Sequence, residues 1–358
     1  MIPLFKPSCT DAEVKEVNRV LRSGWWGMGP ETIAFEKEFA KFVGVQHAVA
    51  VNSCTSALEL AARACRITGK TVAVPAMTFV STAQAMLHAG NKVVFTDVEE
   101  DDLVIDWKTV PEEADAVVPV WFGGSVLSPE PCFNSPWPTV PIIEDCAHAA
   151  GSPDAGQIGW AACWSFHAVK NLATGDGGMV TTDDPYVYER LLKLRWCGID
   201  KSTWERDQGR YGWDYDIPGD GEKMHMNDIT AALGRVQLRR LHEMNGKRQK
   251  IAQRYTEEFY RLKWLTLLNM SPLDSNHLYI VRLDKRDRNR FIDHMLANGV
   301  SAGVHYKPLT HYPNLFPGEH HVPVTERVWT TLVTLPLFPD MTDAEVSQVI
   351  SAVRSFKV

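Results

Sequence analysis

The feature that most constrains the fold is the alternation of short apolar runs with helical segments in the first 150 residues. Five mainly apolar runs recur, at residues 47–52, 71–75, 92–98, 116–122 and 140–145. Helical patterns lie between several of them, notably at 56–64 and 80–88. Apolar strands of this kind are buried on both faces, and a strand–helix–strand succession joins parallel strands. The pattern therefore predicts an α/β fold with a mainly parallel sheet.

The later segments divide the chain into two domains. A long helical pattern begins at Asp228 and continues to about residue 262, with a break expected near 245–246. A strand is expected at 277–283, and the stretches 123–139 and 202–226 are expected to be irregular. Further helices are predicted at 11–22, with Thr10 as the N-cap, and at 30–42, 185–195, 286–298 and 342–356. We therefore assign residues 1–240 to a large domain and residues 241–358 to a small C-terminal α/β domain.

Composition excludes several classes of protein. The 358 residues carry a net charge of −7, and we expect the densest basic cluster, residues 235–250, to be a solvated helix face. The seven cysteines form no CxxC pair, and the N-terminus lacks the apolar core of a signal peptide. No apolar run reaches the ~18 residues that a membrane span needs. We expect a cytoplasmic protein with free thiols that binds neither nucleic acid nor membrane.

Two polar residues follow predicted strands. Asp145 ends an apolar strand, and ligands of open α/β sheets bind at the carboxyl ends of strands, although an aspartate there also serves as a helix cap. Lys170 lies in a short loop, and Gly175, Gly177 and Gly178 behind it permit tight turns and close backbone approach. A lysine that attacks an aldehyde must be deprotonated by burial or by a nearby cation, whereas most single lysines are solvated surface residues.

A third segment opens a helix directly after the strand at 47–52. Ser53, Thr55 and Ser56 supply hydroxyls there, and the helix start supplies free N–H groups. This combination suits a phosphate dianion, although an ordinary N-cap uses the same residues. The order of phosphate-binding segment, strand-end aspartate and lysine loop is more specific than any one of the three.

With these segments in place, the sequence resembles the DegT/DnrJ/EryC1/StrS family of sugar aminotransferases, which have the fold type I architecture of pyridoxal-phosphate (PLP) enzymes. The resemblance runs nearly end to end. The matching segments include IPLFKPS, SGWWGMGP, VNSCTSALELA, VPAMTFVSTAQAMLHAG, IIEDCAHAAG, SFHAVKNLATGDGGMV, MNDITAALGRVQL, VHYKPL and LPLFPDMTDAEV.

The resemblance implies a role for each matching residue. Lys170 matches the lysine that carries PLP as a Schiff base, and Asp145 matches the carboxylate that bonds the pyridine nitrogen and keeps it protonated. His148 matches a residue near the phenolic oxygen of the cofactor, and Phe79 an aromatic residue near its ring, although Phe79 also suits a core. Asn227 matches an asparagine that reaches the phosphate of the neighbouring subunit, which implies a homodimer with shared active sites. The matched phosphate contacts are Thr55, Ser56 and Ser165.

Substrate contacts are expected from two further segments. His305, Tyr306 and Lys307 lie in a segment that often borders the substrate in relatives. Trp213 lies in an aromatic stretch that either helps to form a sugar-nucleotide cleft or packs within an irregular loop. Cys54 departs from the family, which usually has glycine there, and the stretch 123–139 is shorter and less helical than the usual crossover.

The resemblance implies transfer of an amino group from glutamate or glutamine to a nucleotide-linked keto-deoxysugar, most often a 4-keto-6-deoxyhexose. A keto-inositol aminotransferase is an alternative that sequence separates poorly. A PLP sugar dehydratase of this family would have histidine in place of Lys170, and a non-catalytic protein of this fold would not need the intact lysine and aspartate. The sequence lacks the glycine motif of a nicotinamide-dependent enzyme, and its 12 histidines show no metal-binding spacing.

Overall fold

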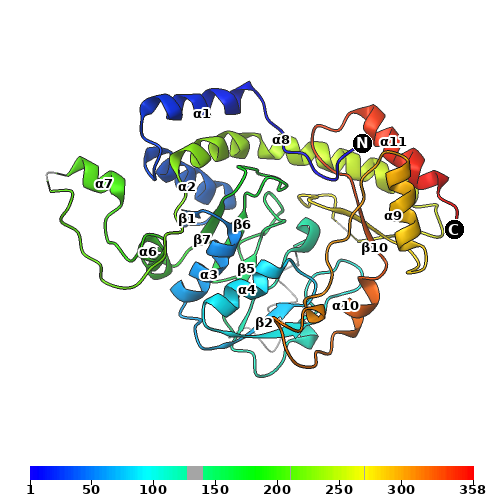
Figure 1. The fold of residues 1–358 in the computed structure, drawn as a ribbon, viewed down its shortest axis with the longest axis horizontal. Helices are drawn as coiled ribbons and strands as arrows, with labels where there is room; N and C mark the ends of the chain where they lie inside the picture. The colour runs from blue at the N-terminus through cyan, green and yellow to red at the C-terminus, as the bar shows by residue number, and fades with distance from the viewer. Residues whose placement is uncertain (127–139, 210, 270) are drawn as a thin grey trace.

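The centre of the molecule is a mixed β-sheet (Figure 1). The computed structural model describes residues 1–126, 140–209, 211–269 and 271–358. Within them, the strands of this sheet are β1 (His47–Val51), β2 (Thr71–Pro75), β3 (Lys92–Thr96), β4 (Ala116–Val117), β5 (Ile143–Asp145), β6 (Ala161–Ser165) and β7 (Gly178–Thr182).

Two groups of strands join to form this sheet. One group has the order β3-β2-β4 and the other β5-β6-β7-β1. Parallel bridges at Val117–Ile142 and Val120–Asp145 connect β4 to β5. Strand β7 runs antiparallel to both β6 and β1, and the other pairs are parallel. The predicted α/β fold with a mainly parallel sheet is confirmed.

Helices cover both faces of the sheet. One face of the sheet is covered by α3 (Cys54–Ala64), α4 (Val80–His88) and α6 (Pro185–Leu194). These helices share a core with one set of alternate side chains of β1 and β2. On the other face α2 (Pro30–Val43) and the first half of α8 (Asp228–Phe259) share a core with β6 and the alternate residues of β1. Figure 1 shows α8 running along the upper side of the molecule, with its first half beneath α1 (Asp11–Ser23). The N-cap of α1, Thr10, forms the predicted capping interaction.

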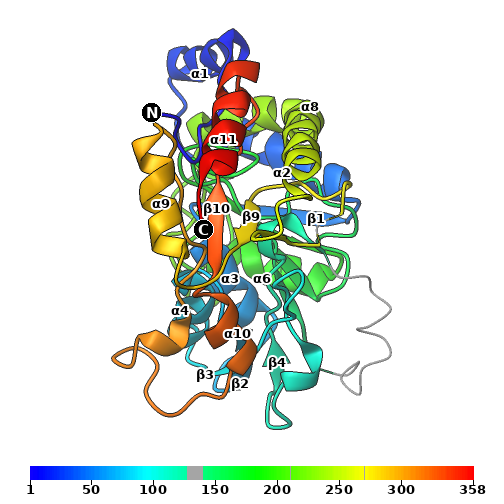
Figure 2. The ribbon, with the colours of Figure 1, turned by 90° about the vertical axis from the view of Figure 1, so that its right-hand side faces the viewer.

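The C-terminal part forms a second core. Strands β10 (Leu332–Leu335), β9 (Tyr279–Arg282) and β8 (Thr266–Leu267) pair antiparallel in that order. Figure 2 shows β10 beside α9 and α11. The helices of this part are α9 (Arg288–Ala297), α10 (Pro323–Val328) and α11 (Asp343–Ser355). The second half of α8 packs into this core, so the domain boundary at 240/241 falls inside a continuous helix, and the domain division stays a prediction.

The structure corrects four expectations. Helix α8 is unbroken at 245–246, because the Asn245 side chain is held by the carbonyl of Ala150 and by Asn171. The run 116–122 is a strand only at Ala116–Val117, since Pro119 has no N–H to donate to a sheet. The stretch 202–226 contains a short helix, α7 (Thr203–Gln208). Arg248 is buried rather than solvated, while most of 123–139 lies outside the described residues.

Candidate active site

Asp145 and Lys170 meet at the carboxyl ends of β5 and β6. Asp145 is the last residue of β5, and Lys170 lies in the turn between β6 and β7, where its N–H donates to the carbonyl of His167 at 2.8 Å. The two side chains interact electrostatically, because each charge shifts the pKa of the other group. The strand-end aspartate and the loop lysine therefore lie in one region of the fold.

The Asp145 carboxylate is buried and held by two hydrogen bonds. The Thr82 hydroxyl donates to Oδ2 at 2.8 Å, and the N–H of Ala147 donates to Oδ1 at 3.0 Å. Burial raises the pKa of Asp145, while these hydrogen bonds and the charge of Lys170 act in the opposite direction. The fold thus buries a carboxylate at a cost in folding free energy, and a cationic ligand bound to that carboxylate would offset this cost.

Lys170 has an amine suited to nucleophilic attack. The residue keeps some accessible surface, but dense protein surrounds its side chain. This burial lowers the pKa of Lys170 to about 8, although the charge of Asp145 acts to raise it. At pH 7 roughly a tenth of the amine is therefore uncharged, far more than for an ordinary lysine, and attack on an aldehyde requires this uncharged form.

The segment before α3 forms a cup of hydroxyls and backbone N–H groups. Ser53 caps the helix by accepting from the N–H of Ser56 at 3.1 Å, and the Ser56 hydroxyl donates to Asn52 at 2.7 Å. The Thr55 hydroxyl makes no hydrogen bond to any described residue. Cys54 begins α3 in ordinary helical backbone, so its replacement of glycine does not disturb the turn. The cup can accept a phosphate at a helix N-terminus.

Gly178 lets β7 approach this cup. A Cβ atom at Gly178 would lie 2.5 Å from the carbonyl carbon of Ser53 and 2.7 Å from the nitrogen of Cys54. Gly178 also pairs with Ser165 at the end of β6. The close approach therefore places Ser165 beside Ser53–Ser56, as the predicted phosphate contacts require.

His148 lies beside Asp145 with both ring nitrogens bonded. Gly123 donates its N–H to Nδ1 at 3.2 Å, and the Tyr306 hydroxyl lies 3.2 Å from Nε2. Burial lowers the pKa of His148 well below its usual value, and the charges of Lys170 and His305 act in the same direction. This imidazole is neutral at physiological pH.

Other predicted residues reach this region to different degrees. The exposed ring of Phe79 lies 6.0 Å from that of Tyr306. His305 is held by the hydroxyl of Thr334, with 2.9 Å between Nδ1 and Oγ1, and burial lowers its pKa to about 4. Lys307 is exposed and extends over the ring of Tyr312 instead.

Two further predicted residues are exposed on the single chain. Asn227 is the exposed N-cap of α8 and accepts from the N–H of Thr230 at 2.9 Å. Trp213 is 77% exposed and contacts Tyr211 on the segment after α7, which stands away from the body in Figure 1. Asn227 already has a structural role as a cap, and its predicted contact with a second subunit stays a prediction.

The sequence analysis missed three residues of this region. Thr82 lies in the first turn of α4, and only the fold brings it to Asp145. Asn171 and His277 are hydrogen bonded to each other at 3.0 Å, and His277 is stacked on Phe5. These contacts join segments far apart in the chain, so no local pattern could have indicated them.

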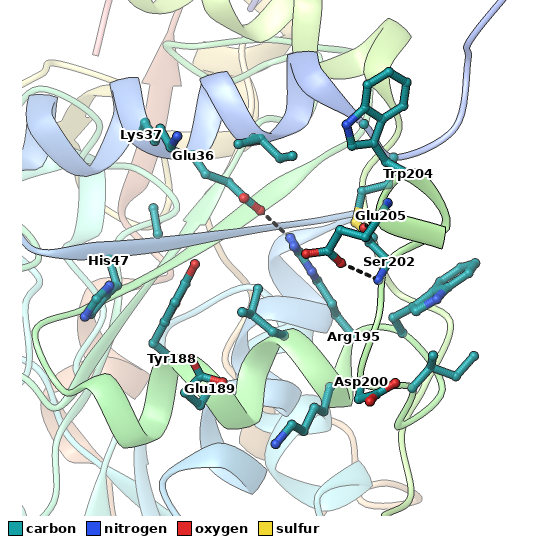
Figure 3. Close-up of a pocket in the computed structure, with 18 of the residues that line it drawn as sticks. Glu36, Lys37, His47, Tyr188, Glu189, Arg195, Asp200, Ser202, Trp204 and Glu205 are labelled. Atoms are coloured by element: carbon teal, nitrogen blue, oxygen red, sulfur yellow. Dashed lines mark hydrogen bonds and ion pairs between the residues drawn. The ribbon is translucent and has the colours of Figure 1, made fainter. Parts of the chain in front are cut away.

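A separate hollow lies beside the start of β1 (Figure 3). Its volume is about 310 Å³, and it lies between α2, α6 and α7. Arg195 forms an ion pair with Glu36 in its wall, and Tyr188 and Trp204 add aromatic surface. None of the predicted cofactor residues lines it.

The described residues contain neither a metal-binding cluster nor a membrane-spanning helix. No cluster of three or more histidine, cysteine or acidic side chains within these ranges is arranged to hold a metal ion. Within the same ranges, no helix combines the length and apolar character required to span a bilayer.

Comparison with known proteins identifies relatives along the whole chain. The sequence model of the DegT/DnrJ/EryC1/StrS aminotransferase family matches residues 7–354. The spore coat polysaccharide biosynthesis protein SpsC of Bacillus subtilis (strain 168) is 37% identical over 374 residues, which cover 99% of this chain and 96% of SpsC.

Solved structures agree with the sequence comparison. The PMP form of the putative sugar aminotransferase Spr1654 from Streptococcus pneumoniae has a TM-score of 0.89 and 31% identity, covering 98% of both chains. The aminotransferase TlmJ from Streptoalloteichus hindustanus has a TM-score of 0.90 and 32% identity, covering 99% of this chain and 98% of TlmJ.

Proposed function

Since the chain belongs to the DegT/DnrJ/EryC1/StrS aminotransferase family, we propose that it transfers an amino group from glutamate or glutamine to a nucleotide-linked keto-deoxysugar, with a 4-keto-6-deoxyhexose as the acceptor. The protein is a PLP-dependent sugar aminotransferase. The observation that carries the proposed amino-group transfer is the convergence of Lys170, Asp145 and the N-terminus of α3 at one end of the sheet.

The described residues fit PLP. The partially unpaired cup at Thr55 and Ser56 suits its phosphate, Asp145 suits its pyridine nitrogen, and Lys170 suits its aldehyde. When bound, PLP supplies an aldehyde that captures amines and a protonated ring that accepts the electrons of a neighbouring carbon. The buried Asp145 carboxylate, fixed by Thr82 and Ala147, can accept the proton of that ring nitrogen as a hydrogen bond.

Lys170 has two tasks in this scheme. It would hold the cofactor through its aldehyde until the amine of the donor takes its place. The Lys170 amine, with its pKa lowered to about 8, would then be free to carry a proton between the α-carbon of the donor and C4′ of the cofactor. An amine that titrates near neutral pH can act as both base and acid, and the same group serves the reverse direction with the keto sugar.

Two of the alternatives are disfavoured by the residues present. Lys170 stands where a PLP sugar dehydratase has histidine, and His167 is exposed three residues away. The intact lysine and aspartate argue against a non-catalytic protein. A keto-inositol acceptor stays the nearest alternative, because the residues that would contact the acceptor, His305, Tyr306, Lys307 and Trp213, are proposals rather than established contacts.

We also propose a homodimer with shared active sites. Asn227 is exposed at the start of α8, where its side chain is available to a neighbouring subunit. Asp228 beside it is buried and accepts from the N–H groups of Gly29 and Thr32, which fixes the segment in place. A fixed, exposed asparagine suits a contact with the phosphate of a partner.

The proposal is tested first on the cofactor. The purified protein should be yellow, lose its absorption band when glutamate is added, and be labelled at Lys170 after borohydride reduction. Lys170→Ala should still bind PLP reversibly but lose turnover by ~10²–10⁴-fold or more, whereas the exposed Lys250→Ala should match the wild type. A colourless protein that does not bind added PLP would contradict the proposed PLP-dependent activity.

The acceptor is tested on the pyridoxamine form. Single-turnover recovery of the yellow band is followed with UDP-, dTDP- and GDP-linked 4-keto-6-deoxyhexoses and with scyllo-inosose. Recovery with a nucleotide sugar and not with the inosose is expected. Recovery with the inosose alone would replace the proposed acceptor by a keto-inositol.

A further inference from the structure

The hydrogen bonds of His148 fix which ring nitrogen carries its proton. The backbone N–H of Gly123 can only donate, and it points to Nδ1 at 3.2 Å. Nδ1 must therefore be unprotonated, and the neutral imidazole carries its proton on Nε2. Gly123 is itself fixed, because its carbonyl accepts from the N–H of His277 at 2.9 Å and it has a left-handed φ of 66°.

This tautomer determines the direction of the Tyr306 hydroxyl. Nε2–H of His148 donates to the Tyr306 oxygen across 3.2 Å, so the hydroxyl proton must point elsewhere. No described residue accepts that proton. The Tyr306 oxygen thus accepts one hydrogen bond, while its own proton has no acceptor among the described residues.

The surroundings of Tyr306 restrict where that proton can go. Its ring lies between those of Phe79 and Phe122, at 6.0 Å from each, and neither ring accepts a conventional hydrogen bond. The charged and titratable groups that face the His148–Tyr306 pair are Asp145, Lys170, His277 and His305. The Tyr306 proton is therefore available to a molecule bound beside Asp145 and Lys170.

We propose that the Tyr306 hydroxyl donates a hydrogen bond to an anionic or carbonyl oxygen of the molecule bound at Lys170, and that Gly123 and His148 fix its direction. The oxygen is either the phenolic oxygen of PLP or the keto oxygen of the acceptor. Tyr306 is then a catalytic residue, and His148 and the Gly123 N–H are positioning groups. The inference rests on the PLP chemistry of the proposed function but not on the identity of the sugar.

The main test is Tyr306→Phe, which keeps the aromatic ring. In the PLP-loaded enzyme without substrates, the absorbance of the lysine–cofactor bond is titrated with pH. If Tyr306 serves the phenolic oxygen, the midpoint should rise, because the unsupported oxygen holds the neighbouring proton more tightly. If it serves the acceptor, the midpoint should stay while kcat/KM for the keto sugar falls ~10- to 100-fold and that for glutamate does not.

Variants of His148 test the positioning role. His148→Gln retains an acceptor for Gly123 and a donor for Tyr306 at similar spacing, so it should retain most of the wild-type behaviour. His148→Leu should reproduce the effect of Tyr306→Phe. Tyr255→Phe serves as the matched control, since Tyr255 donates to the carbonyl of Pro336 in the C-terminal core.

A measurement on the unliganded protein is independent of turnover. Two-bond ¹H–¹⁵N correlation spectra should show His148 as a neutral ring protonated on Nε2 across the physiological range. Protonation on Nδ1 would overturn the inference, as would a Tyr306→Phe enzyme with unchanged midpoint and unchanged kcat/KM for both substrates. If no nucleotide sugar is accepted, the proposed acceptor fails, while the titration midpoint and the spectra still decide this inference.

Discussion

Lys170 has to be uncharged for one step and charged for another. Burial lowers its pKa to about 8, so both forms are populated under physiological conditions. The rate of PLP attachment to the unliganded protein should therefore rise with pH and level off above about 8. Stopped-flow absorbance at several pH values measures this, and a midpoint near the ordinary lysine value of ~10.4 would contradict the environment of this amine.

The same shift affects stability. Between about 8 and the unfolded value of ~10.4 the unfolded chain binds more protons at Lys170 than the folded chain. Stability of the unliganded protein should therefore rise with pH across this window. Lys170→Met should lack this rise, which urea unfolding at pH 8 and pH 10 can measure, and parallel slopes for the two proteins would contradict the shift.

Asp145 gives a prediction of opposite sign for binding and for folding. The pKa of Asp145 is higher in the folded protein than in the unfolded chain, so the wild-type protein loses stability as the pH rises from the unfolded value to the folded value. This loss of stability is still present at neutral pH. Unliganded Asp145→Asn should melt at or above the wild type at pH 7. Added PLP should raise its melting temperature less than that of the wild type. Equal stabilisation of both proteins by PLP would separate Asp145 from the cofactor.

At the scale of elements, the approach of β7 to the start of α3 depends on Gly178. Gly178→Ala should destabilise the protein by ~1–3 kcal/mol and weaken PLP binding, because the added methyl would meet the backbone of Ser53 and Cys54. Gly246→Ala is the matched control, since it lies within α8 in open space and should stabilise the protein by ~0.5–1 kcal/mol. Denaturant unfolding and PLP titration of both variants check this, and similar effects would contradict it.

Local sequence indicated elements well where local signals determine them. The helix at 80–88 and the strand at 71–75 were predicted with the observed bounds, because each has a uniform periodicity between turn residues. The strand predicted over 116–122 is wrong beyond Val117, because Pro119 interrupts its pairing. The break predicted in α8 is wrong because tertiary contacts hold Asn245. Periodicity describes a segment in isolation, whereas these outcomes depend on what lies opposite.

At the scale of the whole molecule, the arrangement of Lys170, Asp145 and the phosphate cup could be anticipated from motif order and resemblance. The contacts that orient them could not. Thr82 reaches Asp145 and Gly123 reaches His148 only after the sheet has brought β5, α4 and the segment after β4 together. Polar contacts between distant segments leave no periodic trace in the sequence.

The proposed dimer leads to a complementation test. Lys170→Ala and Asn227→Ala protomers should each be impaired alone. If Asn227 serves the partner's site, a mixed dimer has one site with both Lys170 and Asn227, and mixing after unfolding and refolding should recover about a quarter of wild-type activity, since half of the dimers are mixed and each has one intact site of two. No recovery in a proven heterodimer, or a fully active monomer, would contradict shared sites.

Residues 2–4 belong to the C-terminal core although they are synthesised long before their partners. The N–H of Ile2 donates to the carbonyl of Gly299, and that of Leu337 donates to the carbonyl of Leu4. During translation this stretch must therefore remain without its partners until residues 299–337 have been made. The C-terminal core can be completed only after that point, although one of its segments is made about 300 residues earlier.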